Sequence, residues 1–168
     1  MQAWKITDVK SFMNHMLVKE TFDDFLLSEA TITTKASFVI DGHLVEDYYT
    51  PEELEVLNQK RITCVSFGEV RSLCFDIIKG KKTPGYFKFV FLMNPEGIAQ
   101  ILERNQIVMR LEDISNLSVN IRYQTGELYV TTGSSLKVFT PDKSVDQAWD
   151  RWVEMFLSDN EILYEKFS

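Results

Sequence analysis

Residues 117–132, LSVNIRYQTGELYVTT, decide the fold class of this chain. Apolar and polar side chains alternate from Leu117 to Tyr123, as they do in strands that have one buried and one exposed face. Thr125-Gly126 is a turn signal, after which the chain returns as a second strand from Leu128 to Thr132. Strands joined by so short a turn run antiparallel. The stretch therefore predicts an antiparallel hairpin with one face open to solvent.

Further strands and helices are predicted on both sides of this hairpin. The predicted strands are rich in β-branched and aromatic residues and cover 3–6, 25–34, 37–40, 86–93 and 136–139. A hairpin turn is predicted at Asp41-Gly42, after the third of these strands. The strand at 86–93 is expected to be largely covered on both faces. The predicted helices have capping residues or an apolar stripe and cover about 9–17, 51–58, 67–79, 95–102 and 144–156. Because tight turns join most neighbouring strands, these elements predict an α+β fold, with helices packed on a mainly antiparallel sheet.

The domain organisation follows from the length and from a repeated order of elements. A chain of 168 residues, 45% apolar and 26% charged, is typical of one folded globular domain, and we predict a single domain over 1–168. A strand, a helix and a hairpin follow one another at the start of the chain and again from the strand at 86–93 onward. This order predicts two related halves, at about 1–50 and 86–140.

The charge balance restricts the class of partner. With 25 acidic against 18 basic residues the net charge is −7. Such a chain repels a polyanion such as DNA at long range unless its basic residues are gathered into a patch. The charge therefore disfavours nucleic acid, which stays an alternative to the favoured protein partner.

The N-terminal segment, the cysteines and the apolar runs indicate the compartment. The segment MQAWKITDVK at 1–10 lacks the apolar core of about seven or more residues that a secretory signal needs. Cys64 and Cys74 are the only cysteines, too few for a disulfide framework. The longest uninterrupted apolar run, 89–93, has five residues, whereas a membrane span needs about twenty. We expect a soluble protein of the reducing cytoplasm, with no membrane partner.

Residues 79–88 hold four of the eighteen basic residues: Lys79, Lys81, Lys82 and Lys88. Lysines on a glycine-containing loop suit an anion such as phosphate, to which the backbone amides add donors. The spacing is not that of a P-loop, in which G-x-x-x-x-G-K-[ST] precedes a helix. The alternative is a solvated helix C-terminus whose lysines offset the helix dipole.

Asn120 and Arg122 belong to a second polar group, on the predicted hairpin and the loop that follows it. The other members of this group are Tyr123, Thr131, Thr132, Ser134 and Ser135. Guanidinium, amide and hydroxyl groups together suit a small anionic ligand. The alternative is an ordinary set of cross-strand pairs on an exposed strand face.

Carboxylates recur at every fourth residue from just before the last predicted helix onward: Asp142, Asp146, Asp150 and Glu154. This spacing places them on one helix face, where like charges repel one another. They extend over about 18 Å of helix and so cannot converge on one metal ion. The stripe is either a docking surface for a basic partner or a solubilising face opposite the apolar side of the helix.

No catalytic residue, cofactor or metal site is predicted. His15 and His43 are 28 residues apart and belong to no H-E-x-x-H or paired C-x-x-C motif, so a zinc site is not expected. No serine lies in the G-x-S-x-G elbow of a hydrolase, and no G-x-G-x-x-G indicates a nucleotide cofactor. Cys64 and Cys74 are expected to be small core residues.

Three segments carry a resemblance to a known family: KITDVKSFM at 5–13, IIKGKKTP at 77–84 and NIRYQTGELYVTTGSSLKVFT at 120–140. Nearly the whole chain resembles a family of small bacterial proteins catalogued as a domain of unknown function. This resemblance implies a bacterial cytoplasmic protein and carries over no catalytic residues. The strand-helix-hairpin order is also similar to the repeating unit of DNA sliding clamps, whose channel helices bear lysines and arginines, although the matching helix faces here are mixed in charge.

These observations favour a non-catalytic interaction module that recognises a protein or an anionic partner. Its candidate site residues are Lys79, Lys81, Lys82, Lys88, Asn120 and Arg122. One alternative is a clamp-like, DNA-associated protein that uses the basic segment 79–88. Another is an undetected hydrolase or transferase that uses dispersed carboxylates such as Asp41 and Glu46. The sequence predicts no particular oligomeric state.

Overall fold

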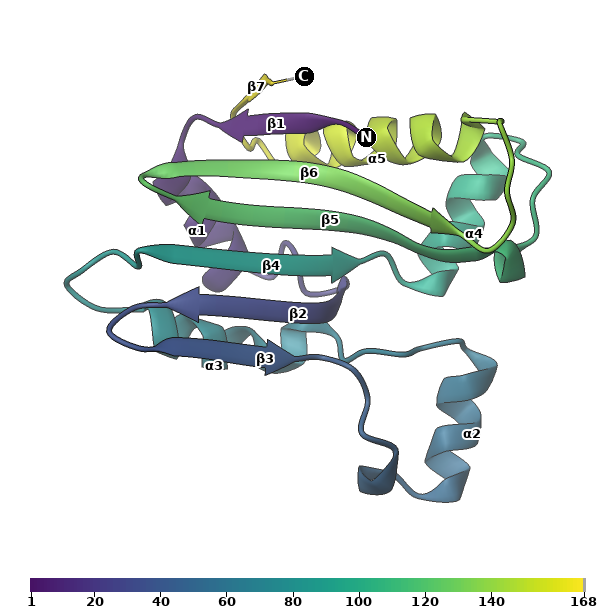
Figure 1. Ribbon diagram of the computed structural model, residues 1–168, viewed down its shortest axis with the longest axis horizontal. Coiled ribbons are helices and arrows are strands. Elements are labelled where there is room, and N and C mark those ends of the chain that lie inside the picture. The colour runs from purple at the N-terminus through teal and green to yellow at the C-terminus, as the bar shows by residue number, and fades with distance from the viewer. Residues whose placement is uncertain (168) are drawn as a thin grey trace.

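A computed structural model describes residues 1–167, and its centre is a seven-stranded sheet (Figure 1). The strands are β1 (Ala3–Ile6), β2 (Leu26–Thr33), β3 (Ser37–Asp41), β4 (Tyr86–Leu92), β5 (Ile114–Gln124), β6 (Glu127–Leu136) and β7 (Tyr164–Lys166). Their spatial order is β3-β2-β4-β5-β6-β1-β7, and every neighbouring pair is antiparallel. The predicted hairpin is β5 and β6. Because β6 continues to Leu136, the separate strand expected at 136–139 does not form, and β7 was not predicted.

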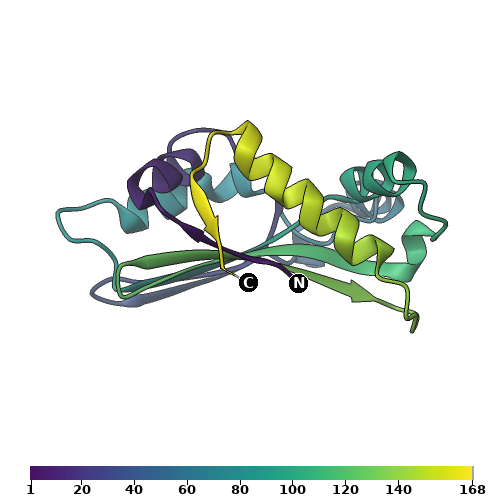
Figure 2. The same cartoon turned by 90° about the horizontal axis from the view of Figure 1, so that it is seen from above.

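The longer helices cover one face of this sheet. They are α1 (Val9–Leu17), α3 (Phe67–Ile78), α4 (Pro95–Arg104) and α5 (Ser144–Asp159). Figure 2 shows them on the same side of the sheet, and no helix of the described chain covers the other side. The short helix η2 (Leu111–Asp113) precedes β5. The predicted α+β class, with helices packed on an antiparallel sheet, is confirmed.

The helix-covered face holds the hydrophobic core. In β4, Phe87, Phe89 and Phe91 are buried, and the residues between them are half buried. The expectation that this strand is covered on both faces is wrong. No helix of the described chain covers its second face. Val90 and Leu92 point to that face and are half buried, which accounts for the unbroken apolar run at 89–93.

The first hairpin turns earlier than predicted. β2 and β3 are joined at 34–36, Asp41 is the last residue of β3, and Gly42 lies just beyond the hairpin. The amide of Gly42 donates to the carbonyl of Ser28 at 2.9 Å, and the amide of Val65 donates to the carbonyl of Gly42 at 2.9 Å. A Cβ atom at Gly42 would lie 1.7 Å from the carbonyl oxygen of Leu27. The close approach of two backbone segments therefore requires glycine at position 42. No turn is formed there that would require it.

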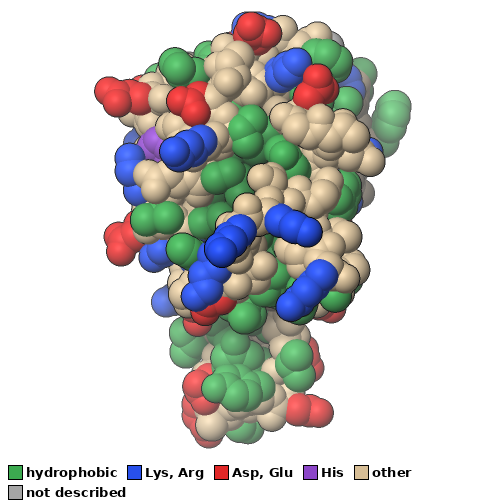
Figure 3. Space-filling view, turned by 90° about the vertical axis from the view of Figure 1, so that its left-hand side faces the viewer, with side chains coloured by type: hydrophobic (Ala, Val, Ile, Leu, Met, Phe, Trp, Pro, Cys, Tyr) green, Lys and Arg blue, Asp and Glu red, His purple; other side chains and the backbone are tan. Residues whose placement is uncertain are grey.

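Residues 44–62 form an arm that projects beyond β3 (Figure 1, Figure 3). The arm contains η1 (Glu46–Tyr48) and α2 (Pro51–Gln59), and no residue of α2 is buried. The predicted capping box is present. The amide of Glu53 donates to Thr50 Oγ1, and the amide of Thr50 donates to the Glu53 carboxylate, both at 3.1 Å.

The order of strand, helix and hairpin occurs twice, as β1-α1-β2-β3 and β4-α4-β5-β6. The strand neighbours differ between the two sets. β4 lies beside β5 of its own hairpin, whereas β1 lies between β6 and β7 and away from β2. The duplicated halves therefore stay a prediction that rests on the order of elements alone.

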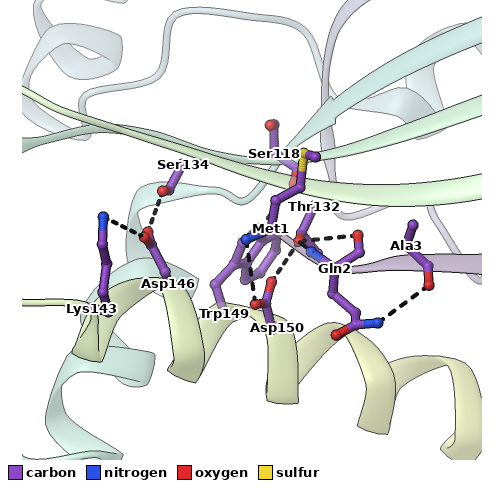
Figure 4. A network of polar contacts seen from close by, with 10 residues as sticks. All are labelled: Met1, Gln2, Ala3, Ser118, Thr132, Ser134, Lys143, Asp146, Trp149 and Asp150. Carbon is purple, nitrogen blue, oxygen red and sulfur yellow. Dashed lines mark hydrogen bonds and ion pairs between the residues drawn. The ribbon is translucent and has the colours of Figure 1, made fainter. Parts of the chain in front are cut away.

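Carboxylates of α5 contact β6, as Figure 4 shows, and a further one contacts β7. Each member of the acidic stripe interacts within the chain: Asp142 with Ser144, Asp146 with Ser134, Asp150 with Thr132, and Glu154 with Lys166. Thr132 is buried and donates to Asp150 at 2.5 Å. Asp146, Asp150 and Glu154 therefore help to hold α5 on the sheet, whereas the docking surface and the solubilising face stay predictions.

Trp149 and Trp4 are both fully buried, but their indole N–H groups differ. That of Trp149 donates to the carbonyl of Ser118 at 2.9 Å (Figure 4), whereas that of Trp4 has no hydrogen-bond partner in the described chain.

Leaving a buried carbonyl without its donor costs about 1 to 3 kcal/mol. Trp149→Phe is therefore expected to lower the free energy of unfolding by about 1 to 3 kcal/mol more than Trp4→Phe, as urea denaturation would measure. Equal losses would contradict this difference.

His15 of α1 is buried, and its Nδ1 lies 2.9 Å from Thr21 Oγ1. Burial lowers the pKa of His15 below its ordinary value of about 6.5, the charge of Lys19 adds to this effect, and Glu161 opposes it. The unfolded chain therefore binds a proton at a higher pH than the folded chain does.

The free energy of unfolding is expected to fall as the pH drops below about 6.5 and to level off once the folded protein is also protonated at His15. Urea unfolding of the wild type and of His15→Asn, at about pH 7.5 and about pH 5.5, isolates this contribution. The wild type should lose more stability on acidification than the variant does. Equal losses in the two proteins would show that His15 is not responsible.

Candidate functional site

The side of the sheet that bears no helix presents alternate residues of its strands to solvent, and we call it the open face. Its central side chains are Glu29, Thr31 and Thr33 of β2, Tyr86, Lys88, Val90 and Leu92 of β4, Ser118, Asn120, Arg122 and Gln124 of β5, Glu127, Tyr129 and Thr131 of β6, and Ala3 and Lys5 of β1. Successive side chains of a strand point to opposite faces, so each of these residues is next to a core residue in the sequence. The packing of the core thereby orients the open face.

Three of the six candidate residues meet on this face. The strand register places Lys88 directly opposite Arg122, and Arg122 directly opposite Tyr129. Asn120 and Thr131 form the neighbouring cross-strand pair on the same side. We call Lys88, Asn120, Arg122, Tyr129 and Thr131 the Arg122 cluster.

The Arg122 cluster holds two positive charges side by side. Directly opposed residues on neighbouring strands have Cβ atoms about 5 Å apart, and like charges in these positions destabilise a sheet. Lys88 Nζ lies 3.3 Å from a carboxylate oxygen of Glu29. Arg122 instead donates to the side-chain oxygen of Gln124 at 3.3 Å and forms no ion pair within residues 1–167. Its guanidinium is exposed and free to bind an anion.

A groove of about 720 Å³ lies along the Arg122 cluster. Its other lining residues are Met1, Ala3, Gln124, Thr125, Glu127 and Phe167. The groove therefore combines guanidinium, ammonium, amide and hydroxyl donors, the groups that bind a carboxylate or a phosphate.

Contacts on the open face keep Lys5, Glu127 and Tyr129 in their ordinary charge states. The Tyr129 hydroxyl donates to Glu127 at 2.7 Å, and Lys5 Nζ lies 3.3 Å from the same carboxylate. The hydrogen bond from Tyr129 and then that from Lys5 lower the pKa of Glu127, and the hydrogen bonds to Glu127 raise the pKa values of Lys5 and Tyr129. All three pKa values move away from neutrality, the reverse of what a general acid or base needs. This pattern favours binding over proton transfer.

The other three candidate residues, Lys79, Lys81 and Lys82, lie on the loop between α3 and β4, at the same end of the sheet as the β5–β6 turn. Lys79 Nζ is 3.0 Å from Asp76, whereas Lys81 and Lys82 are exposed and form no ion pair in the described chain. Figure 3 looks onto this end and shows Lys and Arg side chains gathered on it. The six candidate residues thus share one end of the sheet, but only three of them share the open face.

The second polar group of the sequence is divided between the two faces of the sheet, so it is not one site. Tyr123 lies on the helix side, where its ring stacks on Phe87 with 5.0 Å between centroids. Thr132 and Ser134 also point to the helix side and donate to α5. The alternation of a strand separates neighbouring residues in this way. Of this group, Asn120, Arg122 and Thr131 remain together.

Three residues of the open face, Tyr129, Lys5 and Glu29, were not among the predicted site residues. Tyr129 could have been found, because the two-residue turn at Thr125-Gly126 sets a register in which Arg122 faces Tyr129. Lys5 and Glu29 belong to strands distant in the sequence. No local pattern predicts which strands lie beside each other, so their place near the cluster was not predictable.

Of the groups considered for catalysis, the two cysteines and Glu46 lie apart from this face, whereas Asp41 lies at its edge, directly opposite Glu29. Within residues 1–167, no three His, Cys, Asp or Glu side chains are placed to hold a metal ion. Cys64 and Cys74 are buried as expected, and burial raises the pKa of both thiols, that of Cys74 to about 11. Asp41 accepts a hydrogen bond from His43 Nδ1 at 2.7 Å at the end of β3, whereas Glu46 belongs to the arm.

These observations define an α+β domain with an open antiparallel sheet face that carries a cationic cluster. The chain belongs to a family of unknown function, DUF5721, whose model matches residues 15–165. No curated protein and no solved structure matches the chain at a significant level. No helix in residues 1–167 combines the length and the apolar character that crossing a bilayer requires.

Proposed function

We propose that this protein is a non-catalytic binding module whose open face recognises an acidic segment of a partner protein. The observation that carries the proposal is the pair of Lys88 and Arg122, directly opposite each other on neighbouring strands. This arrangement costs stability, and Arg122 has no carboxylate in the described chain to offset the cost. Carboxylates of a partner would offset it and would bind the guanidinium in bidentate geometry.

The surrounding charges favour a short acidic segment over a nucleic acid duplex. Glu29 and Glu127 flank the Arg122 cluster, and the chain as a whole has a net charge of −7. A duplex carries one charge for about every 1.7 Å of its axis and would bring phosphates against these acids. A few carboxylates on an extended segment can contact Arg122 and Lys88 and avoid their acidic neighbours.

In this proposal the protein works in the reducing cytoplasm of a bacterial cell. Cys64 and Cys74 are both free and buried, in keeping with that compartment. Recognition through a rigid sheet also suits a binding role, because the core on the opposite side fixes the positions of the cluster.

A second candidate is a clamp-like, DNA-associated protein that uses the basic segment 79–88. It is favoured by one observation, that Lys81 and Lys82 are exposed and without ion pairs in the described chain. Phosphate contacts by four lysines would give a slope of about −3 to −4 in the logarithm of the binding constant against the logarithm of the salt concentration.

Calorimetric titration of the full chain with a glutamate-rich peptide and with a short DNA duplex separates these candidates. We expect the peptide to bind more tightly than the duplex, with a salt dependence shallower than that of four phosphate contacts. Failure of the peptide to bind at low salt would contradict the proposal. Tighter binding of the duplex, with the steep slope, would replace it with the second candidate.

A further inference from the structure

The arm, residues 44–62, exposes both apolar and acidic side chains. Val45, Tyr48 and Val56 are 67%, 83% and 49% exposed, and no residue of α2 is buried. The arm also bears five acidic residues, which are Glu46, Asp47, Glu52, Glu53 and Glu55. Apolar surface left uncovered on a projecting element is typical of an interaction site.

The arm is nevertheless well ordered by local contacts. α2 begins with proline and with the reciprocal capping box of Thr50 and Glu53. The amide of Leu44 donates to the carbonyl of Thr63 at 3.0 Å and closes the base of the arm. A helix of nine residues is marginal on its own, so a cover on its apolar side would add to its stability.

A groove between α1 and α3 has the complementary character. Its volume is about 520 Å³, and its apolar lining consists of Met13, Leu17, Val18, Phe75 and Ile78. Lys10 and Lys79 stand at its edge, and Lys81 and Lys82 follow on the adjoining loop. Asp8 also lines the groove and accepts from the amide of Ser11, and Asp76 pairs with Lys79. Lys10, Lys81 and Lys82 form no ion pair in the described chain and keep the groove edge basic.

We propose that the arm of one copy of this chain docks in the α1–α3 groove of a second copy. The apolar side chains of the arm would fill the groove, and its acids would face the lysines at the groove edge. The sizes agree, since α2 is about 14 Å long and the groove lies along helices of about 14 Å and 18 Å. One chain carries both the acidic, apolar arm and the lysine-edged, apolar groove, so a second copy supplies a surface of complementary charge and apolar character to each.

The arm cannot fill the groove of its own chain. Figure 1 shows α2 at the lower right and the loop that follows α3 at the left, at opposite ends of the long axis. α3 starts close to the base of the arm and ends at the groove. The contact between copies therefore joins two different surfaces, which makes a head-to-tail assembly.

Sedimentation velocity of the full chain over a range of concentrations tests this inference. One variant, Lys10→Glu with Lys79→Glu, reverses the charge at the groove. Another, Asp47→Lys with Glu55→Lys, reverses the charge of the arm and leaves the capping box intact. Two controls, Lys143→Glu at the start of α5 and Glu103→Lys near the end of α4, each reverse one charge outside the arm and the groove. Circular dichroism checks that every variant is folded.

We expect the wild type and both controls to associate reversibly at low salt, and each charge-reversal variant to associate at least about tenfold more weakly. An equimolar mixture of the two variants should recover association, because one retains a native arm and the other a native groove. A wild type that is monomeric at every concentration would overturn the inference. Association that neither variant weakens, or that the mixture does not recover, would overturn it as well.

Discussion

Gly42→Ala is expected to lower the free energy of unfolding by about 3 kcal/mol or more. The new Cβ atom would lie 1.7 Å from the carbonyl oxygen of Leu27, a distance that no adjustment of a side chain can relieve. The backbone would have to move, and the hydrogen bonds of Gly42 with Ser28 and Val65 would be lost or strained. Urea denaturation followed by circular dichroism measures the loss.

The matched control is Gly85→Ala, just before β4. A Cβ atom there has no neighbour within 4 Å, so this variant should be as stable as the wild type within about 1 kcal/mol. If the two alanine variants unfold at the same urea concentration, the close approach of β2 to Gly42 is wrong.

The variant Lys88→Gln with Arg122→Gln is expected to weaken binding of a glutamate-rich peptide at least about a hundredfold. Each hydrogen bond to a charged group contributes about 1.5 to 3 kcal/mol, and the variant removes both cations of the Arg122 cluster. Its stability should stay within about 1 kcal/mol of the wild type, because relief of the Lys88–Arg122 repulsion offsets the lost ion pair with Glu29. Calorimetry gives the affinity and urea denaturation gives the stability.

A variant with the same change of charge, Lys137→Gln with Lys143→Gln, serves as the control. Both lysines are exposed and lie outside the open face. This control should bind the peptide as the wild type does. If the two double variants lose affinity equally, overall charge rather than the Arg122 cluster accounts for binding.

The fold could be predicted where the pattern is local. The alternation that ends at Tyr123 predicts the β5–β6 hairpin, and it places Asn120 and Arg122 on the same strand face. The position of β1 between β6 and β7 could not be predicted, because strand neighbours depend on packing of the whole chain. Asp41-Gly42 does not form the predicted turn, because in a sequence a glycine required by a close backbone approach resembles a glycine required by a turn.

The site was predictable to a similar extent. Lys88 and Arg122 were both candidates, but they belonged to separate groups until the pairing of β4 with β5 joined them. The acids of α5 show the opposite case. Their spacing predicts one helix face, yet only the packing reveals that Thr132 and Ser134 lie against it.

The most direct test of the account is a nuclear magnetic resonance titration of the isotope-labelled wild type with the glutamate-rich peptide. The side-chain Nε–H signal of Arg122 and the side-chain amide signals of Asn120 report on the open face. We predict that these signals, with the backbone amides of β4 to β6, change most. Changes confined to the groove between α1 and α3, or no change at low salt, would contradict the assignment of the open face as the binding site.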